Sequence, residues 1–157
     1  MRDSTLAQRG PDIPQNIDPV RPLLDAGVKV SLHSDSPVSP SFPLLFVHFA
    51  ATRLYQVPPG GTPAALGPQH RVSTLEALKC VTLYPDEAAY SEHEIGSLQP
   101  GKLADIVVLE QDPTAIDLGA DPDGISRIRV LQANWCQGPI PNNVIIEMRL
   151  SVASRLS

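Results

Sequence analysis

The sequence is short of cysteine, of long apolar runs and of clustered basic charge, and each shortage excludes a class of protein. Its two cysteines, Cys80 and Cys136, form no Cys-x-x-Cys pair and no metal-binding spacing. Two such cysteines fit a reduced compartment, and we predict a cytoplasmic protein. The densest apolar run, residues 46–51, is interrupted by His48 and is far below the ~20 residues of a membrane span. Residues 1–5 lack the apolar stretch of a signal peptide, so we expect no membrane partner.

The charge and the length set further bounds. The formal net charge is −5, and the 12 lysines and arginines are scattered along the chain. Because binding to phosphates needs clustered basic residues, we expect no nucleic-acid partner. The 157 residues suffice for one ordinary domain. They fall well short of the ~250 residues that are typical of a whole (β/α)₈ barrel.

Periodicity and turn residues predict an α/β chain that changes character near residues 92–96. Asp18 and Pro19 are typical of a helix start, and Gly27 is typical of a helix end. Ser73 and Glu76 have the spacing of a capping box, which predicts a helix from that point. The expected elements are helices over 18–26, 44–55, 73–82 and 85–90, and strands over 28–32, 106–109 and 125–131. We divide the chain into residues 1–92, residues 93–131 and a tail over 132–157 without a clear pattern.

The densest polar cluster is His33-Ser34-Asp35-Ser36-Pro37, directly after the predicted strand. In α/β barrels, functional residues lie at these C-terminal strand ends. A carboxylate at Asp35 can ligate a metal ion and take a proton, although Asp-Ser-Pro is equally good turn chemistry. A Ser–His–Asp triad is excluded, because adjacent strand residues point to opposite faces.

The remaining histidines give no metal site. His48 lies in an apolar helix and reads as a packed core residue, whereas His70 and His93 fall in predicted loops and should be solvated. No His-x-His and no His-Glu-x-x-His occurs in the sequence. A zinc site takes three or four protein ligands, and this sequence offers one good candidate, Asp35.

Three blocks of sequence together resemble a known family. They are LDAGVKVSLHSDSPV at 24–38, RVSTLEALKCVT at 71–82 followed by AAY at 88–90, and GSLQPGKLADIVVL at 96–109. In this order and spacing they resemble the amidohydrolases, in particular the branch of N-substituted formamide deformylase-like and exoenzyme-regulatory-protein-like enzymes. The resemblance covers about residues 1–131.

The resemblance implies a fold and a chemistry. The fold would be the C-terminal end of a (β/α)₈ metal-dependent hydrolase barrel plus part of a small composite β-sandwich, incomplete as a stand-alone chain. The reaction would be hydrolysis of a carbon–nitrogen bond other than a peptide bond, in a small amide-like or formamide-like substrate. Asp35 would be the catalytic residue and a ligand of zinc or another divalent metal. His33 shares the polar face of the predicted strand with Asp35, and we take it as a candidate for binding substrate. Lys102 and Asp105 would be structural.

The departures from the family leave three readings open. The His-x-His and the other metal-binding residues of the family are absent, and residues 132–157 do not match it. The chain is therefore a fragment of an amidohydrolase that is inactive and binds no metal alone, a degenerate non-catalytic remnant, or a binding or regulatory module. A quarter of a barrel leaves strand edges unpaired, so we also expect self-association.

Overall fold

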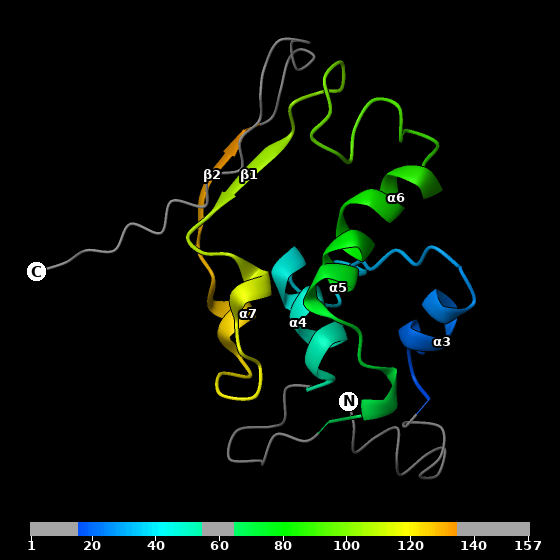
Figure 1. Cartoon of the computed structure of the whole chain (residues 1–157), viewed down its shortest axis with the longest axis vertical. Coiled ribbons are helices and arrows are strands. Elements are labelled where there is room, and N and C mark those ends of the chain that lie inside the picture. The colour runs from blue at the N-terminus through cyan, green and yellow to red at the C-terminus, as the bar shows by residue number, and fades with distance from the viewer. Residues whose placement is uncertain (1–15, 55–64, 135–157) are drawn as a thin grey trace, which may run out of the picture.

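The computed structural model describes residues 16–54 and 65–134, which form short helices and one two-stranded sheet (Figure 1). The α/β content expected from the sequence is confirmed in this part of the chain. Cys136 and residues 135–157 of the expected tail lie outside the described residues. In chain order the elements are α3 (Val20–Asp25), α4 (Pro43–Thr52), η1 (Pro68–His70), α5 (Thr74–Val81), α6 (Leu83–Ala88), β1 (Ile106–Leu109), η2 (Pro113–Ala115), α7 (Gly124–Arg127) and β2 (Val130–Asn134).

Helix α3 ends as its sequence predicts but starts differently. Gly27 has a φ of 78° and donates its N–H to the Leu24 carbonyl, while Val28 donates to the Leu23 carbonyl. These two bonds form a Schellman motif, which favours glycine because of the left-handed backbone. At the other end Pro19, rather than Asp18, is the N-cap, and no side chain caps the helix. The expected cap at Asp18 is wrong, since Asp18 itself has a φ of 49°.

The segment over 28–32 is not the ladder strand that its alternation predicts. Within the described residues it has no strand assignment, and the Leu32 N–H donates to the Cys80 carbonyl at the end of α5 (2.9 Å). The alternation survives from residue 29 on: Val30 and Leu32 pack on the core, whereas Lys29 faces outward and pairs with Glu87. Val28, predicted on the same face as Val30, is exposed instead. A ladder strand requires a second strand with which it forms hydrogen bonds. The described residues supply no such strand beside residues 28–32.

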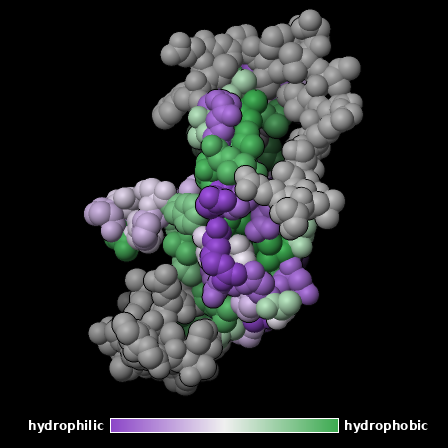
Figure 2. Space-filling view, turned by 90° about the vertical axis from the view of Figure 1, so that its left-hand side faces the viewer, coloured by the Kyte–Doolittle hydropathy of each residue, from purple (hydrophilic) through white to green (hydrophobic). Residues whose placement is uncertain are grey.

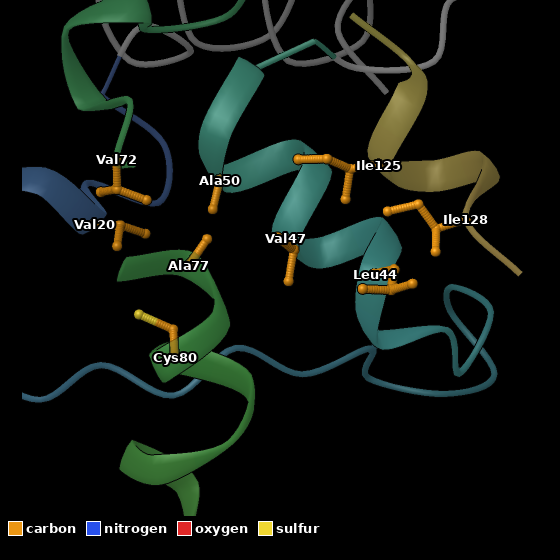
Figure 3. Packing of buried hydrophobic residues seen from close by; sticks show 9 residues of the cluster. All are labelled: Val20, Leu44, Val47, Ala50, Val72, Ala77, Cys80, Ile125 and Ile128. Atoms are coloured by element: carbon orange, nitrogen blue, oxygen red, sulfur yellow. The ribbon is translucent and has the colours of Figure 1, made fainter. Parts of the chain in front are cut away.

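The core lies where α4 packs between α5 and α7 (Figures 1 and 3). Ala50 of α4 faces Ala77 of α5, and Leu44 of α4 lies next to Ile128. Ile125 is fully buried and Ile128 is 2% exposed. The buried cluster consists of Val20, Leu44, Val47, Ala50, Val72, Ala77, Cys80, Ile125 and Ile128. Residues from both sides of the predicted boundary at 92–93 therefore share one core.

Helix α5 begins with the capping box that its sequence predicts. The Ser73 hydroxyl accepts from the Glu76 N–H (3.2 Å), and the Glu76 carboxylate accepts from the Ser73 N–H (2.8 Å). The Ser73 N–H and the Ser73 hydroxyl, which also donates to the Glu76 carboxylate (2.7 Å), hold the pKa of this carboxyl down at about 2, with a further contribution from Arg21. Arg21 of α3 donates to both Glu76 oxygens, so the same carboxylate also joins α3 to α5.

The strand expected over 125–131 is wrong for its first half. Residues Gly124–Arg127 form helix α7, and only from Val130 does the chain pair in β2. The reason lies in packing, because a helical turn places Ile125 and Ile128, three residues apart, on one face against α4. Branched residues alone do not separate a strand from a short buried helix.

Strand β1 is confirmed, and it pairs with β2 in an antiparallel ladder from Ile106 opposite Asn134 to Leu109 opposite Val130. Residues 132–134, which we predicted to be part of the tail over 132–157, belong to this sheet. Apolar surface is exposed on the side of the molecule that Figure 2 shows. The exposed apolar residues of the two strands are Val107, Val108, Val130 and Leu131. No helix among the described residues has the length and apolarity that a membrane span requires.

Candidate active-site turn and its surroundings

Asp35 lies in an exposed turn directly after the extended segment. Its φ is 52°, and its carbonyl accepts from the Val38 N–H (2.8 Å) across the cis Ser36–Pro37 bond. The alternative of a turn residue is therefore confirmed for its backbone. The carboxylate itself is exposed, so it is accessible to a substrate, a water molecule or a metal ion. Both readings of Asp35 are compatible, since the turn fixes the backbone and leaves the side chain available.

His33 is brought next to Asp35, although the two side chains do not form a relay. The His33 Nδ1 atom accepts a hydrogen bond from the Asp35 backbone N–H at 3.0 Å. The Ser34 hydroxyl accepts in the same way from the Ser36 N–H (3.2 Å). The Ser39 hydroxyl donates to the Ser34 carbonyl (2.6 Å) and closes the turn. Side-chain to backbone bonds of this kind are typical of ordered turns.

A pocket of about 390 Å³ lies between α3, the extended segment and α4. His33 borders it, whereas Asp35 is not among the lining residues. Its wall is mostly apolar and includes aromatic rings from α4. The lining residues are Asp18, Pro19, Val20, Leu23, Val30, Ser31, Leu32, His33, Phe46, Phe49, Ala50 and Arg53. The pocket therefore adjoins the candidate turn without containing its carboxylate.

Arg53 is a buried residue that the sequence does not reveal. It ends α4 in the left-handed conformation, with a φ of 60°, and is 2% exposed. Its guanidinium donates to the carbonyls of Leu66 (2.9 Å), Asp18 (3.0 Å) and Ile17 (2.5 Å). It thus links segments far apart in the sequence. The available sequence signal was a charged residue directly after an apolar run. Because a buried arginine needs hydrogen-bond acceptors, such a residue indicates contacts with carbonyl groups.

His48 is a core residue, as its apolar helix predicts. It is 4% exposed, and its Nε2 lies 3.8 Å from Asp123 Oδ1. Its Nδ1 is buried without a hydrogen-bond partner among the described residues. Burial lowers the pKa of His48 from its usual 6.5, and the nearby Asp123 carboxylate opposes this shift only in part. The neutral imidazole is therefore the form that the folded protein favours.

This burial predicts a loss of stability in mild acid. Above about pH 6.5 His48 is neutral in both states and the stability is complete. As pH falls below that value, the unfolded chain takes up a proton that folded His48 resists, so the free energy of unfolding should fall by up to ~1.4 kcal/mol per pH unit until the lowered pKa is reached. Urea unfolding followed by circular dichroism between about pH 7.5 and pH 5.5 measures this slope.

The matched control for His48 is His93, whose side chain is 71% exposed. The slope should shrink in His48→Gln and persist in His93→Gln. Glu76, with its pKa of about 2, titrates below this window and does not contribute. Equal slopes in the wild type and in His48→Gln would show that another group causes the acid sensitivity.

Of the two histidines predicted in loops, His70 is buried and His93 is exposed. His70 was expected to be solvated, and this is wrong: it is 8% exposed, and its Nε2 lies 3.3 Å from Asn16 Oδ1. It is buried because η1 places it against the described N-terminal residues. His93 is exposed, as expected.

The described residues do not make a metal site by themselves. No group of three or more histidine, cysteine, aspartate or glutamate side chains comes together in residues 16–54 and 65–134. Asp35 can supply a single carboxylate ligand, whereas a zinc site takes three or four protein ligands. The donor set seen here does not fit a resident metal ion without further residues.

Lys102 has the structural place that was expected of it. Its ammonium group donates to the carbonyls of Glu92 and Ile95 and to the Ser97 hydroxyl (2.5, 3.2 and 2.7 Å). These contacts close the loop between α6 and β1. Gly96 in that loop has a φ of 84° and passes so close to Asp86 that a Cβ atom would lie 1.7 Å from its Oδ2. The Lys102 ammonium group is thus engaged in holding this loop.

Comparison with known proteins gives a consistent result. A model of the amidohydrolase family matches residues 3–128. The chain is 40% identical over 95 residues to an N-substituted formamide deformylase of Arthrobacter pascens, covering 60% of this chain and 17% of that protein. It is 39% identical over 87 residues to the Protein LONG AFTER FAR-RED 3 of Arabidopsis thaliana, covering 55% and 14%.

A third relative is a 5-methylthioadenosine/S-adenosylhomocysteine deaminase of Thermoanaerobacter pseudethanolicus, 38% identical over 96 residues, covering 60% of this chain and 20% of that protein. The chain thus spans a fifth or less of the length of these relatives. No solved structure matches it.

Proposed function

The chain belongs to the amidohydrolase family, and from this premise we propose that it takes part in hydrolysing a carbon–nitrogen bond other than a peptide bond. Family membership implies a fold of the (β/α)₈ barrel type. The described residues are a small α/β fragment with a two-stranded sheet, which is consistent with part of such a domain. We assign residues 1–92 to the end of the barrel and residues 93–131 to part of a small β-sandwich.

The observation that carries the proposal is the Asp35 turn. It presents an exposed carboxylate on an ordered backbone, directly after an extended segment whose apolar residues pack on the core. A carboxylate in this setting can accept a proton from an attacking water molecule and return it to the leaving nitrogen. We propose Asp35 as the catalytic residue on that basis.

Family members generally use a divalent metal ion. We propose zinc, with Asp35 as one of its ligands. Because the described residues offer only this ligand, we propose that the remaining ligands come from the rest of a whole barrel. The chain alone would then bind no metal tightly and would be inactive.

The names of the relatives support a small-molecule substrate. One is a deformylase of N-substituted formamides, and another is a deaminase of adenosine derivatives. We propose an amide-like or formamide-like substrate, which His33 at the edge of the pocket would help to bind. The acidic chain, at −5, supports the absence of nucleic-acid partners. We propose a cytoplasmic location.

A second candidate is a non-catalytic remnant or a binding or regulatory module. The same scarcity of metal ligands among the described residues favours it. Such a module would retain the packed α4–α5–α7 core without catalysing a reaction. The two candidates differ in one expectation: only the first predicts that the chain hydrolyses a substrate through Asp35 when it is part of a whole barrel.

The test joins this chain to the barrel portion of the Arthrobacter pascens deformylase, in place of that enzyme's own matching segment. The joined protein, supplied with zinc, should hydrolyse an N-substituted formamide, whereas the 157-residue chain and the barrel portion alone should each match the buffer blank. A folded, zinc-loaded joined protein without turnover would favour the second candidate. If the isolated chain turns over substrate and Asp35→Asn loses this activity, the proposal that the isolated chain is inactive is wrong.

The exposed apolar side chains of β1 and β2 support self-association of the isolated chain. Open strand edges present unpaired N–H and C=O groups, which invite pairing with another chain. Sedimentation velocity should therefore show species larger than a monomer. A single monomeric species across a wide concentration range would contradict this.

A further inference from the structure

We propose that His33 is a positioning residue, which holds the backbone of Asp35 through its Nδ1 atom and so fixes where the Asp35 carboxylate lies. This inference rests on the proposed role of Asp35. It differs from a direct substrate contact, because the ring acts through its neighbour. It goes beyond the proposed function, which assigns His33 only to substrate binding.

The first support is the hydrogen bond itself. The Asp35 N–H donates to His33 Nδ1 over 3.0 Å, from two residues further along the chain. This spacing is that of an Asx turn, in which an asparagine or aspartate oxygen accepts from the N–H two residues on. Because Nδ1 accepts, it carries no proton, and the proton of the neutral ring resides on Nε2. The ring orientation is thus tied to the Asp35 backbone.

The second support is the conformation that must be held. Asp35 has a φ of 52°, which non-glycine residues adopt infrequently. Three other described non-glycine residues have positive φ: Arg53 and Tyr90 lie at the ends of helices, where left-handed residues are common, and Asp18 lies just before α3. Asp35 instead follows an extended segment. Its conformation therefore depends on contacts within the turn.

The third support is the division of those contacts. The Ser34 hydroxyl holds the Ser36 N–H, and the Asp35 carbonyl holds the Val38 N–H. The bond to His33 engages the N–H of Asp35 itself. Loss of the Nδ1 acceptor would leave the later half of the turn intact and would release the peptide unit that precedes the Asp35 side chain.

The fourth support is the anchoring of His33. Its preceding residue, Leu32, packs on the core and donates its N–H to the Cys80 carbonyl (2.9 Å). His33 itself is exposed, so the core fixes its backbone from one side only. A ring attached to an anchored backbone can transmit that order to Asp35, two residues beyond.

Two substitutions separate positioning from substrate contact. In His33→Asn the side-chain oxygen lies where Nδ1 lies, so the bond to the Asp35 N–H is retained while the Nε2 side of the ring is lost. In His33→Gln a polar atom lies near the position of Nε2, and the Nδ1 acceptor is lost. Both variants are polar and suit an exposed position, so neither should unfold the core.

The experiment measures hydrogen exchange of the Asp35 amide in the 157-residue chain, by mass spectrometry with fragmentation to single residues. The amide should exchange slowly in the wild type and in His33→Asn. In His33→Gln it should exchange roughly 2–10-fold faster, the range expected for losing one ordinary hydrogen bond. The amides of α5 should be unchanged in all three proteins, which shows that the fold is intact. Equal exchange of the Asp35 amide in all three proteins would overturn the proposal.

A second readout is turnover by the chain joined to the deformylase barrel. His33→Gln should lower kcat by up to ~10²-fold with little change in KM, since a small displacement of a catalytic group has effects of this size. His33→Asn should recover most of kcat. If both variants lose activity alike, mainly through KM, His33 acts only by contacting the substrate, and the positioning role fails. If no joined protein turns over, the proposed function fails, whereas the exchange pattern still decides whether His33 holds Asp35.

Discussion

Replacing Asp35 with alanine in the chain joined to the deformylase barrel should lower turnover by at least ~10²–10⁴-fold, the loss typical of a removed proton-transfer group. The core should be unaffected, because the Asp35 carboxylate is exposed and the turn is held by backbone atoms and by neighbouring side chains. Alanine adopts a φ of 52° less readily than aspartate, so we also expect a small loss of stability of about 1 kcal/mol. Steady-state rates on an N-substituted formamide, expressed per mole of folded protein, measure the effect.

The control for Asp35 is Lys102→Ala. Lys102 holds the loop between α6 and β1 through three hydrogen bonds, so its loss should lower the melting temperature and leave kcat nearly unchanged. Asp35→Ala should instead lower kcat strongly and change the melting temperature only slightly. Equal loss of kcat in the two variants would remove the assignment of Asp35 as the catalytic residue.

Replacing Arg53 with methionine should destabilise the chain by roughly 3–5 kcal/mol, because one buried and two part-buried hydrogen bonds of its guanidinium are lost together. Methionine keeps an apolar stem of similar length, so the change tests the guanidinium rather than the packing. The carbonyls of Leu66, Asp18 and Ile17 would all be affected. Since domains are stable by only ~5–15 kcal/mol, a loss of this size is readily measured by urea unfolding.

Arg71 offers the matched control for Arg53. It is exposed, and its Nε donates to one carbonyl, that of Thr52 at the end of the same helix (2.9 Å). Arg71→Met should cost about 1 kcal/mol, because it removes a single hydrogen bond made by an exposed side chain. Comparable losses in the two variants would mean that burial and the number of acceptors do not determine the contribution of Arg53.

Local sequence rules predicted the parts of the fold that depend on local bonds. The capping box at Ser73 and the end of α3 at Gly27 are formed by residues a few positions apart, so their spacing alone identifies them. The rule failed for Ile125 and Ile128. There a branched apolar run predicts a strand, but the contact with α4 selects a helical turn, and this contact comes from a distant part of the chain.

The candidate site divides in the same way. Asp35 was predicted from the polar cluster after an alternating segment, and it is exposed in the structure. Its catalytic role stays a prediction. The bond from its N–H to His33 depends on a φ of 52°, which the sequence does not encode in a recognisable pattern. Arg53 and His70 were missed for another reason. Their partners are carbonyl and amide oxygens of segments distant in sequence, and no spacing rule reaches that far.

The shared core has a consequence for anyone who recombines or truncates this chain. Ile125 and Ile128 complete the packing of α4, although residues 53–123 separate α4 from α7 in sequence. A crossover point between residues 92 and 93 would give α4 to one parent and its buried neighbours to the other. An exchangeable module therefore has to run through Ile128, which is also the last residue that the family model matches.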